Sequence, residues 1–289
     1  MSSDNLLKKV KQLREITGVG FKDCKNAIDE TKGDIEKSIG FLRKKGIAKA
    51  TKRMGRTAAE GLVCISEKDN KFSMIEINSE TDFVAKNDEF INFAEEVSNL
   101  ALTCSGKMEE ILKSKMGNKK NVDESLIDLV SKIGEKITIR RSGFIGTKNH
   151  LNFSYTHSSI KKNIGKIGVL LSIETKKEKK DVINIGKQLA MQIASLSPLA
   201  IDKEDLDANV IKKEKEIITE ELKNSGKDIK IAEKIAIGKL NKFIGENTLL
   251  NQEWIMEPKK KVKDVINDFA GKDKFVIKDF LRFKVGEGL

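Results

Sequence analysis

The segment GLVCISEKDNKFSMIEI (61–77) contains the clearest structural pattern in the chain. Its ends, GLVCI (61–65) and FSMIEI (72–77), are apolar runs of strand length, and the polar segment KDNK (68–71) between them is typical of a turn. This arrangement predicts a β-hairpin. A helix is predicted to follow from about Asp88, because apolar residues recur there at helical spacing: Phe90, Ala94, Val97 and Ala101.

The next part of the chain repeats this combination of strand and helix. More helix is predicted over 108–116 and 123–136, with a strand over 137–145. A second α+β unit begins near residue 151, and two patterns define it. Apolar residues at every second position predict a half-buried strand: Ile167, Val169, Leu171 and Ile173. The next apolar set predicts a helix: Val182, Gly186, Leu189, Ile193 and Leu196. The late segment FVIKDFLRFKV (275–285) alternates in the same way, so we expect it to pair back into this second sheet.

The N-terminal part predicts a bundle of three short helices over residues 4–46. Leu6, Val10, Leu13 and Thr17 lie on one face of the first helix, which Gly18 and Gly20 end. Asp23 is predicted to cap the second helix, which Gly33 ends, and Asp34 to cap the third, which Gly46 ends. The basic segment KATKRMGR (49–56) then resembles a linker.

The two prolines, Pro198 and Pro258, bracket a segment with two long helical patterns. The turn-like NSGKD (224–228) separates them, so we predict a protruding antiparallel helical hairpin at about 199–250. The complete prediction is an α+β protein with a bundle and linker over 1–54, a first core unit over 55–150 and a second over 151–289, which contains the hairpin.

Composition narrows the function classes. The chain has 289 residues and a net charge of +11, with 38% apolar, 34% charged and only 5% aromatic residues. Residues 1–56 carry a net charge of +8 (15 basic, 7 acidic), whereas residues 57–102 carry −7 (3 basic, 10 acidic). The basic excess is either a set of solvated helix faces or a surface for an acidic protein. Few aromatic residues are present to stack on bases, so direct RNA binding is not favoured and no DNA binding is expected.

The apolar runs and the N-terminus bear on membrane insertion and export. No apolar run approaches the roughly 20 residues that span a bilayer, and the N-terminus has no continuous apolar stretch typical of a signal peptide. We therefore expect a cytoplasmic protein without a membrane partner.

The residues that usually mark enzyme chemistry do not form a pattern. The sequence has no GxxxxGK[ST] loop and no GxGxxG after a strand. His150 and His157 match no metal-binding pair, and the three cysteines are too widely spaced for a CxxC motif. We expect no enzyme activity, no metal and no cofactor. On residue type alone, Phe83 fits a core position, Asp82 a turn or cap, and Val19 and Phe21 the core of the bundle.

Several segments, in order along the chain, resemble the elongation factor Ts family. LREITGVGFKDCKNAI (13–28) is similar to the family's N-terminal signature and TDFVAKN (81–87) to its central signature. Four later segments also resemble family segments in the expected order: IGKIGVLLSIE (164–174), AMQIASLSP (190–198), IAEKIAIGKLNKFIGENTLL (231–250) and FLRFKVGEGL (280–289). Together the six segments extend over most of the chain.

The resemblance implies a nucleotide exchange factor for the GTPase elongation factor Tu. Such a factor binds Tu-GDP, disturbs its magnesium and phosphate site and releases GDP, so that GTP can bind. The bundle would be a ubiquitin-associated-like (UBA-like) domain docked on the GTPase domain, and the hairpin would be the family's coiled coil. The implied partner contacts fall into three groups: Thr81, Asp82, Phe83 and Val84 as the exchange wedge, Val19, Gly20 and Phe21 in the bundle, and His157, Gly165 and Gly168 in the second core unit.

The chain also departs from the family pattern. Lys22 replaces a second apolar residue, SSIKKNI (158–164) is longer than usual, Lys166 stands where Arg is common, and Asp228 where Pro is frequent. Longer members add a terminal helix whose contact we expect to be missing here. Two other functions stay open at this point: an RNA- or ribosome-binding protein, and a ubiquitin-like adaptor that works through the bundle. Pairing of two copies through their cores also stays open.

Overall fold

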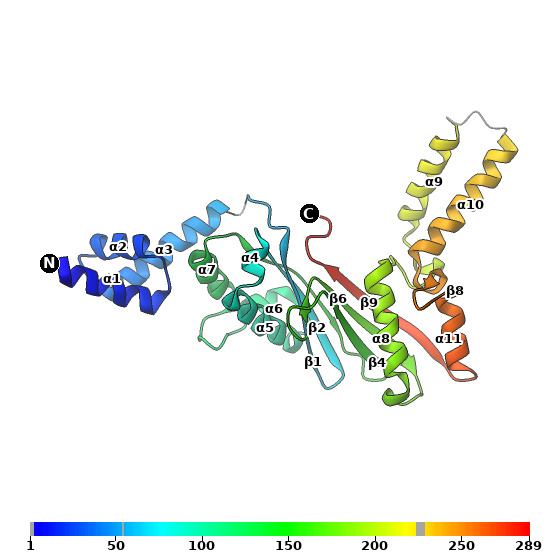
Figure 1. Ribbon diagram of the computed structural model, residues 1–289, viewed down its shortest axis with the longest axis horizontal. Helices are drawn as coiled ribbons and strands as arrows, with labels where there is room; N and C mark the ends of the chain where they lie inside the picture. Colours follow the sequence, from blue (N-terminus) through cyan, green and yellow to red (C-terminus); the bar gives the residue numbers. More distant parts are fainter. Residues whose placement is uncertain (1–2, 54, 224–228) are drawn as a thin grey trace.

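The computed structural model describes residues 3–53, 55–223 and 229–289 of the chain. The molecule is elongated, with a helical bundle at one end, a β-rich core in the middle and a projecting helical hairpin at the other end (Figure 1). The predicted α+β class is confirmed.

The hairpin predicted over 61–77 forms the centre of the first sheet. Strand β1 (Glu60–Lys68) pairs antiparallel with β2 (Lys71–Ser79), and the turn residues Asp69 and Asn70 have positive φ angles of 51° and 62°. Both residue types tolerate this conformation, which two-residue hairpin turns require. The sheet order is β3-β2-β1-β5, with these outer strands: β3 (Ile137–Ile145) and β5 (Ile164–Gly165).

The chain between β2 and β3 forms four helices: α4 (Asp82–Ala85), α5 (Asp88–Thr103), α6 (Met108–Lys113) and α7 (Val122–Ile133). Helix α5 packs on β1 and β2 and begins where predicted, because the Asn87 side chain accepts hydrogen bonds from the backbone N–H of Glu89 and Phe90. Helix α7 ends at Ile133 rather than 136, because Gly134 adopts the left-handed conformation with φ of 90°.

The second sheet has the order β4-β6-β9 and the predicted final strand at its edge. Its strands are β4 (Leu151–His157), β6 (Ile167–Thr175) and β9 (Phe275–Lys284). Helix α8 (Lys179–Leu196) packs against β4 and β6. The sequence patterns did not predict three elements between the hairpin and β9: β7 (Glu253–Trp254), β8 (Glu257–Lys261) and α11 (Val262–Ala270).

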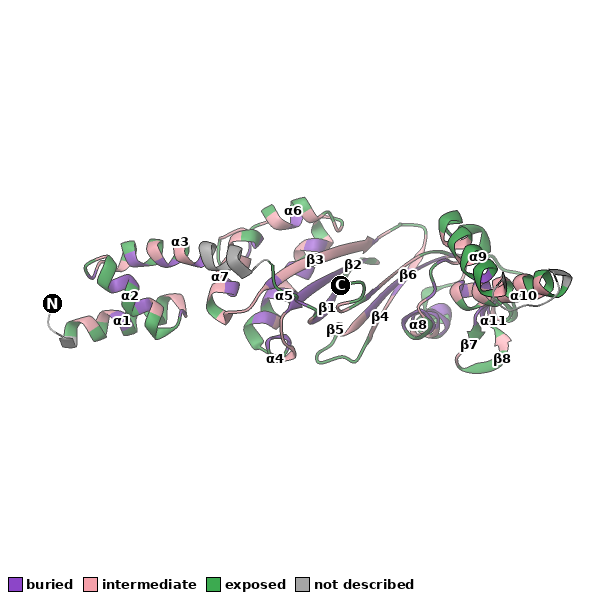
Figure 2. Cartoon of the chain, turned by 90° about the horizontal axis from the view of Figure 1, so that it is seen from above, coloured by how far each residue is buried: buried purple, intermediate pink, exposed green. Residues whose placement is uncertain are grey.

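The two sheets pack against each other. An apolar cluster joins Val63 and Met74 of the first sheet to Leu170 and Phe283 of the second. Gly168 allows this close approach, because a Cβ at this position would lie 2.5 Å from Val63 Cγ1 and 2.6 Å from Met74 Sδ. The core therefore consists of two facing sheets with helices on their outer faces, and Figure 2 shows the buried residues gathered there.

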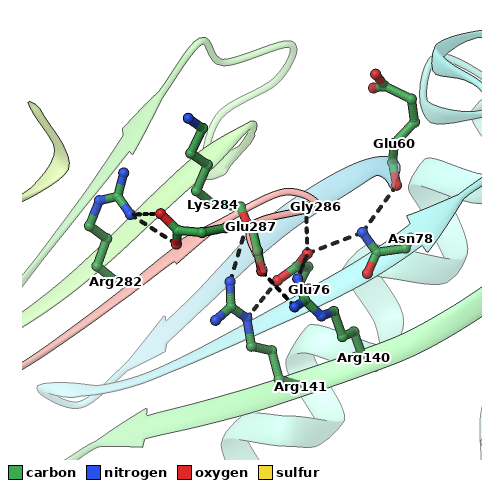
Figure 3. A network of polar contacts seen from close by, with 9 residues as sticks. All are labelled: Glu60, Glu76, Asn78, Arg140, Arg141, Arg282, Lys284, Gly286 and Glu287. Atoms are coloured by element: carbon green, nitrogen blue, oxygen red, sulfur yellow. Dashed lines mark hydrogen bonds and ion pairs between the residues drawn. The ribbon is translucent and has the colours of Figure 1, made fainter. Parts of the chain in front are cut away.

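A buried carboxylate connects the two sheets at one end (Figure 3). Glu76 of β2 is fully buried and forms ion pairs of 3.0 Å with Arg140 and 2.6 Å with Arg141. It also accepts a hydrogen bond of 2.9 Å from the Gly286 N–H, and Arg141 donates one of 3.1 Å to the Lys284 carbonyl. Burial would raise the pKa of Glu76, but the hydrogen bonds from Gly286, Asn78 and the arginines outweigh it and lower the pKa.

The bundle has three helices, as predicted: α1 (Ser3–Thr17), α2 (Phe21–Glu30) and α3 (Ile35–Arg53). Asp34 caps α3 as predicted, because its Oδ1 accepts a hydrogen bond from the Lys37 N–H at 3.0 Å. The predicted cap Asp23 was wrong, since Gly20 is the N-cap of α2 and the helix begins three residues earlier than a helix capped by Asp23 would.

The predicted end of the third helix at Gly46 was also wrong, and most of the expected linker is helical. Helix α3 continues to Arg53. A glycine inside a helix costs only about 1 kcal/mol, and the alanines that follow favour the helix. Helix α3 also packs on α7, with an ion pair between Arg43 and Glu124, so the bundle is attached to the core.

The predicted helical hairpin is confirmed. Helix α9 (Ala208–Lys223) packs against α10 (Ile229–Asn247), and Lys239 forms an ion pair with Glu221 across them. At 1.5 Å per residue the helices are about 24 and 28 Å long, and they project away from the core (Figure 1). The predicted turn, 224–228, lies outside the described residues.

Candidate functional site

The segment TDFVAKN forms a single helical turn, α4, at the end of β2. Some of its side chains are buried in the protein core and others are exposed to solvent. Val84 and Ala85 are buried in the cluster between the first sheet and α5, whereas Phe83 is 79% exposed. Among the large hydrophobic side chains whose exposure the structure describes, Phe83 is the most exposed. A ring in this position is available to another molecule.

Hydrogen bonds hold the start of this turn. The N–H and the hydroxyl of Thr81 each donate to the Glu135 carboxylate, at 3.0 and 2.8 Å. The Ser79 hydroxyl donates to the Thr81 carbonyl at 2.9 Å. Phe83 therefore projects from an anchored backbone rather than from a loose loop.

Charged side chains lie around Asp82, the neighbour of Phe83. Asp82 pairs with Lys86 at 2.8 Å, and Lys166 pairs with Glu60 at 2.6 Å. The hydrogen bond from Lys86 lowers the pKa of Asp82, and the positive charge of Lys166 acts in the same direction. The site thus combines an exposed apolar ring with a polar frame of charged side chains next to it in the fold (Asp82, Lys86, Lys166 and Glu60), a combination typical of interface anchors.

The second core unit contributes Lys166 to this frame, but the predicted residues near it differ in exposure. His157 is exposed, and its Nδ1 lies 3.0 Å from the Tyr155 hydroxyl. Gly165 and Gly168 are buried. A Cβ at Gly165 would lie 2.5 Å from the His157 carbonyl oxygen, so both glycines allow close packing within the protein.

The predicted contacts of the bundle also differ from one another. Val19 is buried in the bundle core, as its residue type suggested. Gly20 is exposed at the start of α2, and the Phe21 side chain is 43% exposed. The adjacent Gly18 lies against the side chain of Lys132 on α7, so this loop is next to the core.

Sequence reasoning missed the residues that support the site. Glu80, Glu135 and Lys166 belong to separate parts of the chain and meet only in the folded protein. Their residue types alone are typical of any surface. Within the described ranges, no group of three or more His, Cys, Asp or Glu side chains is arranged to hold a metal ion. The helices of the same ranges include none that is long and apolar enough to cross a membrane.

The fold and site define a class of protein: an α+β core with two helical extensions that presents the exposed ring of Phe83 on a short helical turn. Comparison with known proteins gives the family. The family model "Elongation factor TS" matches residues 80–287. This chain therefore belongs to the elongation factor Ts family, and its role is that of a translation elongation factor.

Curated relatives agree over nearly the whole length. The chain is 42% identical over 286 residues to elongation factor Ts of Bartonella quintana (strain Toulouse), covering 97% of this chain and 92% of the relative. It is 41% identical over 283 residues to that of Methylorubrum populi and 39% identical over 285 residues to that of Parvibaculum lavamentivorans, with the same coverage. The resemblance seen in the sequence is confirmed, and it includes the bundle.

Proposed function

We propose that this protein is the guanine nucleotide exchange factor of elongation factor Tu. It binds Tu-GDP, disturbs the magnesium and phosphate site of the GTPase and promotes GDP release, so that GTP can bind. The observation that carries this proposal is the exposed Phe83 ring on an anchored turn beside Asp82. The protein acts through binding, without covalent chemistry.

The chemistry of the two residues suits a wedge. A phenylalanine ring buries a large area and has few rotamers to lose, so one exposed ring can anchor an interface. Full burial of such a side chain contributes about 1.5–3 kcal/mol. The carboxylate of Asp82 can exchange its partner Lys86 for donors that otherwise hold helices of the GTPase together.

Thermodynamic linkage sets the size of the required effect. If the factor weakens nucleotide binding by a given ratio, the nucleotide weakens binding of the factor by the same ratio. A thousandfold effect needs about 4 kcal/mol of differential contact. Burial of Phe83 supplies part of this difference, and we assign the remainder to lost coordination of the magnesium ion.

Further contacts would add affinity outside the wedge. We assign the exposed Phe21 and Gly20 to contact with the GTPase domain, and His157 to contact with the third domain of elongation factor Tu. Val19, Val84, Gly165 and Gly168 would support these contacts from within the fold, because their own side chains or Cα atoms are buried. Translation takes place in the cytoplasm, where we place the protein.

The test is release of labelled GDP from purified elongation factor Tu, with and without the full-length chain. We expect strong acceleration by the wild type and a loss of at least tenfold in Phe83→Ala. Leu199→Ala is the matched control, because Leu199 is 59% exposed but lies in the connection after α8. No acceleration by the wild type, or full acceleration by Phe83→Ala, would contradict the proposal.

A further inference from the structure

Glu135 lies in the short turn between α7 and β3, directly opposite the start of the wedge. Gly134 ends α7 in the left-handed conformation, and the next residue then faces the end of β2. Both carboxylate oxygens of Glu135 are used, since Oε2 accepts from the Thr81 N–H and Oε1 from the Thr81 hydroxyl. Hydrogen bonds to an ionised group are the stronger ones, and a two-point contact also fixes orientation.

Helix α4 needs such an anchor because it is only four residues long. A helix this short is not stable by itself in water. Thr81 is its N-cap residue, but the Thr81 side chain makes no capping hydrogen bond within α4. The turn is therefore held from two sides, by burial of Val84 and Ala85 and by Glu135.

The same turn also holds the residue before Thr81. Glu80 accepts a hydrogen bond of 2.6 Å from the Lys136 N–H and pairs with Arg56 at 3.2 Å. The Lys136 side chain donates to the Arg56 carbonyl at 2.7 Å. The segment 134–136 thus fixes the end of β2 and the point where the chain from the bundle enters the core.

We propose that Glu135 is a positioning residue for nucleotide exchange. In this role it acts by holding Thr81, and through it Phe83, in the conformation that enters the partner. This inference rests on the proposed exchange function. Without Glu135 the turn becomes ordered only when it binds the GTPase. The conformational entropy lost in that step reduces the binding free energy that is left to displace the nucleotide.

The first test separates positioning from affinity. In Glu135→Ala we expect the maximal rate of GDP release to fall by at least about tenfold, because both charge-assisted hydrogen bonds to Thr81 are lost. The factor concentration for half-maximal release should change by less than about threefold, because the other contacts stay intact. Glu135→Gln keeps one acceptor oxygen and should recover part of the rate. Glu110→Ala is the control, since Glu110 of α6 pairs with Lys107, the residue before that helix, at 2.9 Å, and its loss should leave both parameters unchanged.

The second test asks whether Glu135 acts through Phe83. If it does, Glu135→Ala adds no further loss to Phe83→Ala. A full additional loss in that background would overturn the proposal. So would a Glu135→Ala protein that retains the wild-type maximal rate.

The third test does not depend on exchange activity. Amide hydrogen exchange over residues 81–86 of the free protein should be faster in Glu135→Ala than in the wild type and unchanged in Glu110→Ala. Unchanged protection in Glu135→Ala would overturn the positioning role. A different outcome separates the two proposals. If the wild type does not accelerate GDP release but Glu135→Ala still loses protection over residues 81–86, the proposed exchange function is wrong, whereas the ordering of the turn by Glu135 is confirmed.

Discussion

Glu76 Oε2 and Arg141 Nε are 2.6 Å apart, and the carboxylate is completely buried between the two sheets of the core. The guanidinium of Arg141 also lies over the Phe283 ring, 4.3 Å from its centroid. One ion pair between neighbouring strands of the first sheet therefore also contacts the last strand of the second sheet. A single substitution at Glu76 should therefore change the free energy of unfolding of the whole core.

Removing the Glu76 charge should destabilise the whole core. Glu76→Gln leaves Arg140 and Arg141 without their buried counter-charge, which should lower the free energy of unfolding by about 2–4 kcal/mol, since both guanidinium groups are partly exposed. Urea denaturation at neutral pH measures the change. The control Glu174→Ala removes a surface carboxylate paired with Lys274 and should have a far smaller effect. Equal stabilities of Glu76→Gln and the wild type would contradict this role.

The same carboxylate predicts an acid dependence. The pKa of Glu76 in the folded protein is lowered from its ordinary value of 4.5. Its stabilising effect is therefore fully present above about pH 4.5 and is lost as the pH falls through the folded-state pKa. We expect the difference in Tm between the wild type and Glu76→Gln to be constant from pH 8 to about pH 5 and to shrink below that. If the difference in Tm grows as the pH falls, the pKa of Glu76 is raised in the folded protein and not lowered.

Two glycines should respond oppositely to the same substitution. Gly168→Ala places a methyl group against Val63 and Met74 between the sheets and should cost about 1–3 kcal/mol. Gly238→Ala on α10 meets no atom within 4 Å and should stabilise the helix by up to about 1 kcal/mol. Thermal unfolding of both variants provides the comparison. A tolerated methyl group at residue 168 would mean that the sheets are less closely packed than described.

Two phenylalanines separate stability from function. Phe90 is completely buried under the first sheet, and Phe90→Ala should cost about 3–5 kcal/mol. Phe83→Ala removes an exposed ring and should change the free energy of unfolding by less than about 0.5 kcal/mol. Chemical denaturation and GDP release, measured on the same preparations, test both statements. A marked loss of stability in Phe83→Ala would place its ring inside the fold.

Much of the local structure is determined by the sequence itself. The apolar runs around KDNK form β1 and β2, the alternation from Ile167 to Ile173 forms β6, and Asp34 caps α3. These features depend on neighbours within a few residues, so periodicity and capping chemistry suffice to predict them. The family resemblance likewise uses only the order of short segments along the chain.

Only the tertiary structure decided how these elements serve the site. Residue type placed Phe83 in a core, but successive residues on a helix are rotated by about 100°, so anchoring Val84 and Ala85 inside turns Phe83 outward. The burial of Glu76 depends on a second sheet whose last strand lies some two hundred residues further along the chain. Glu135 lies next to Thr81 because the chain between them, which contains α5, α6 and α7, folds back to the end of β2. Such contacts join distant residues, and no local pattern in a single sequence encodes them.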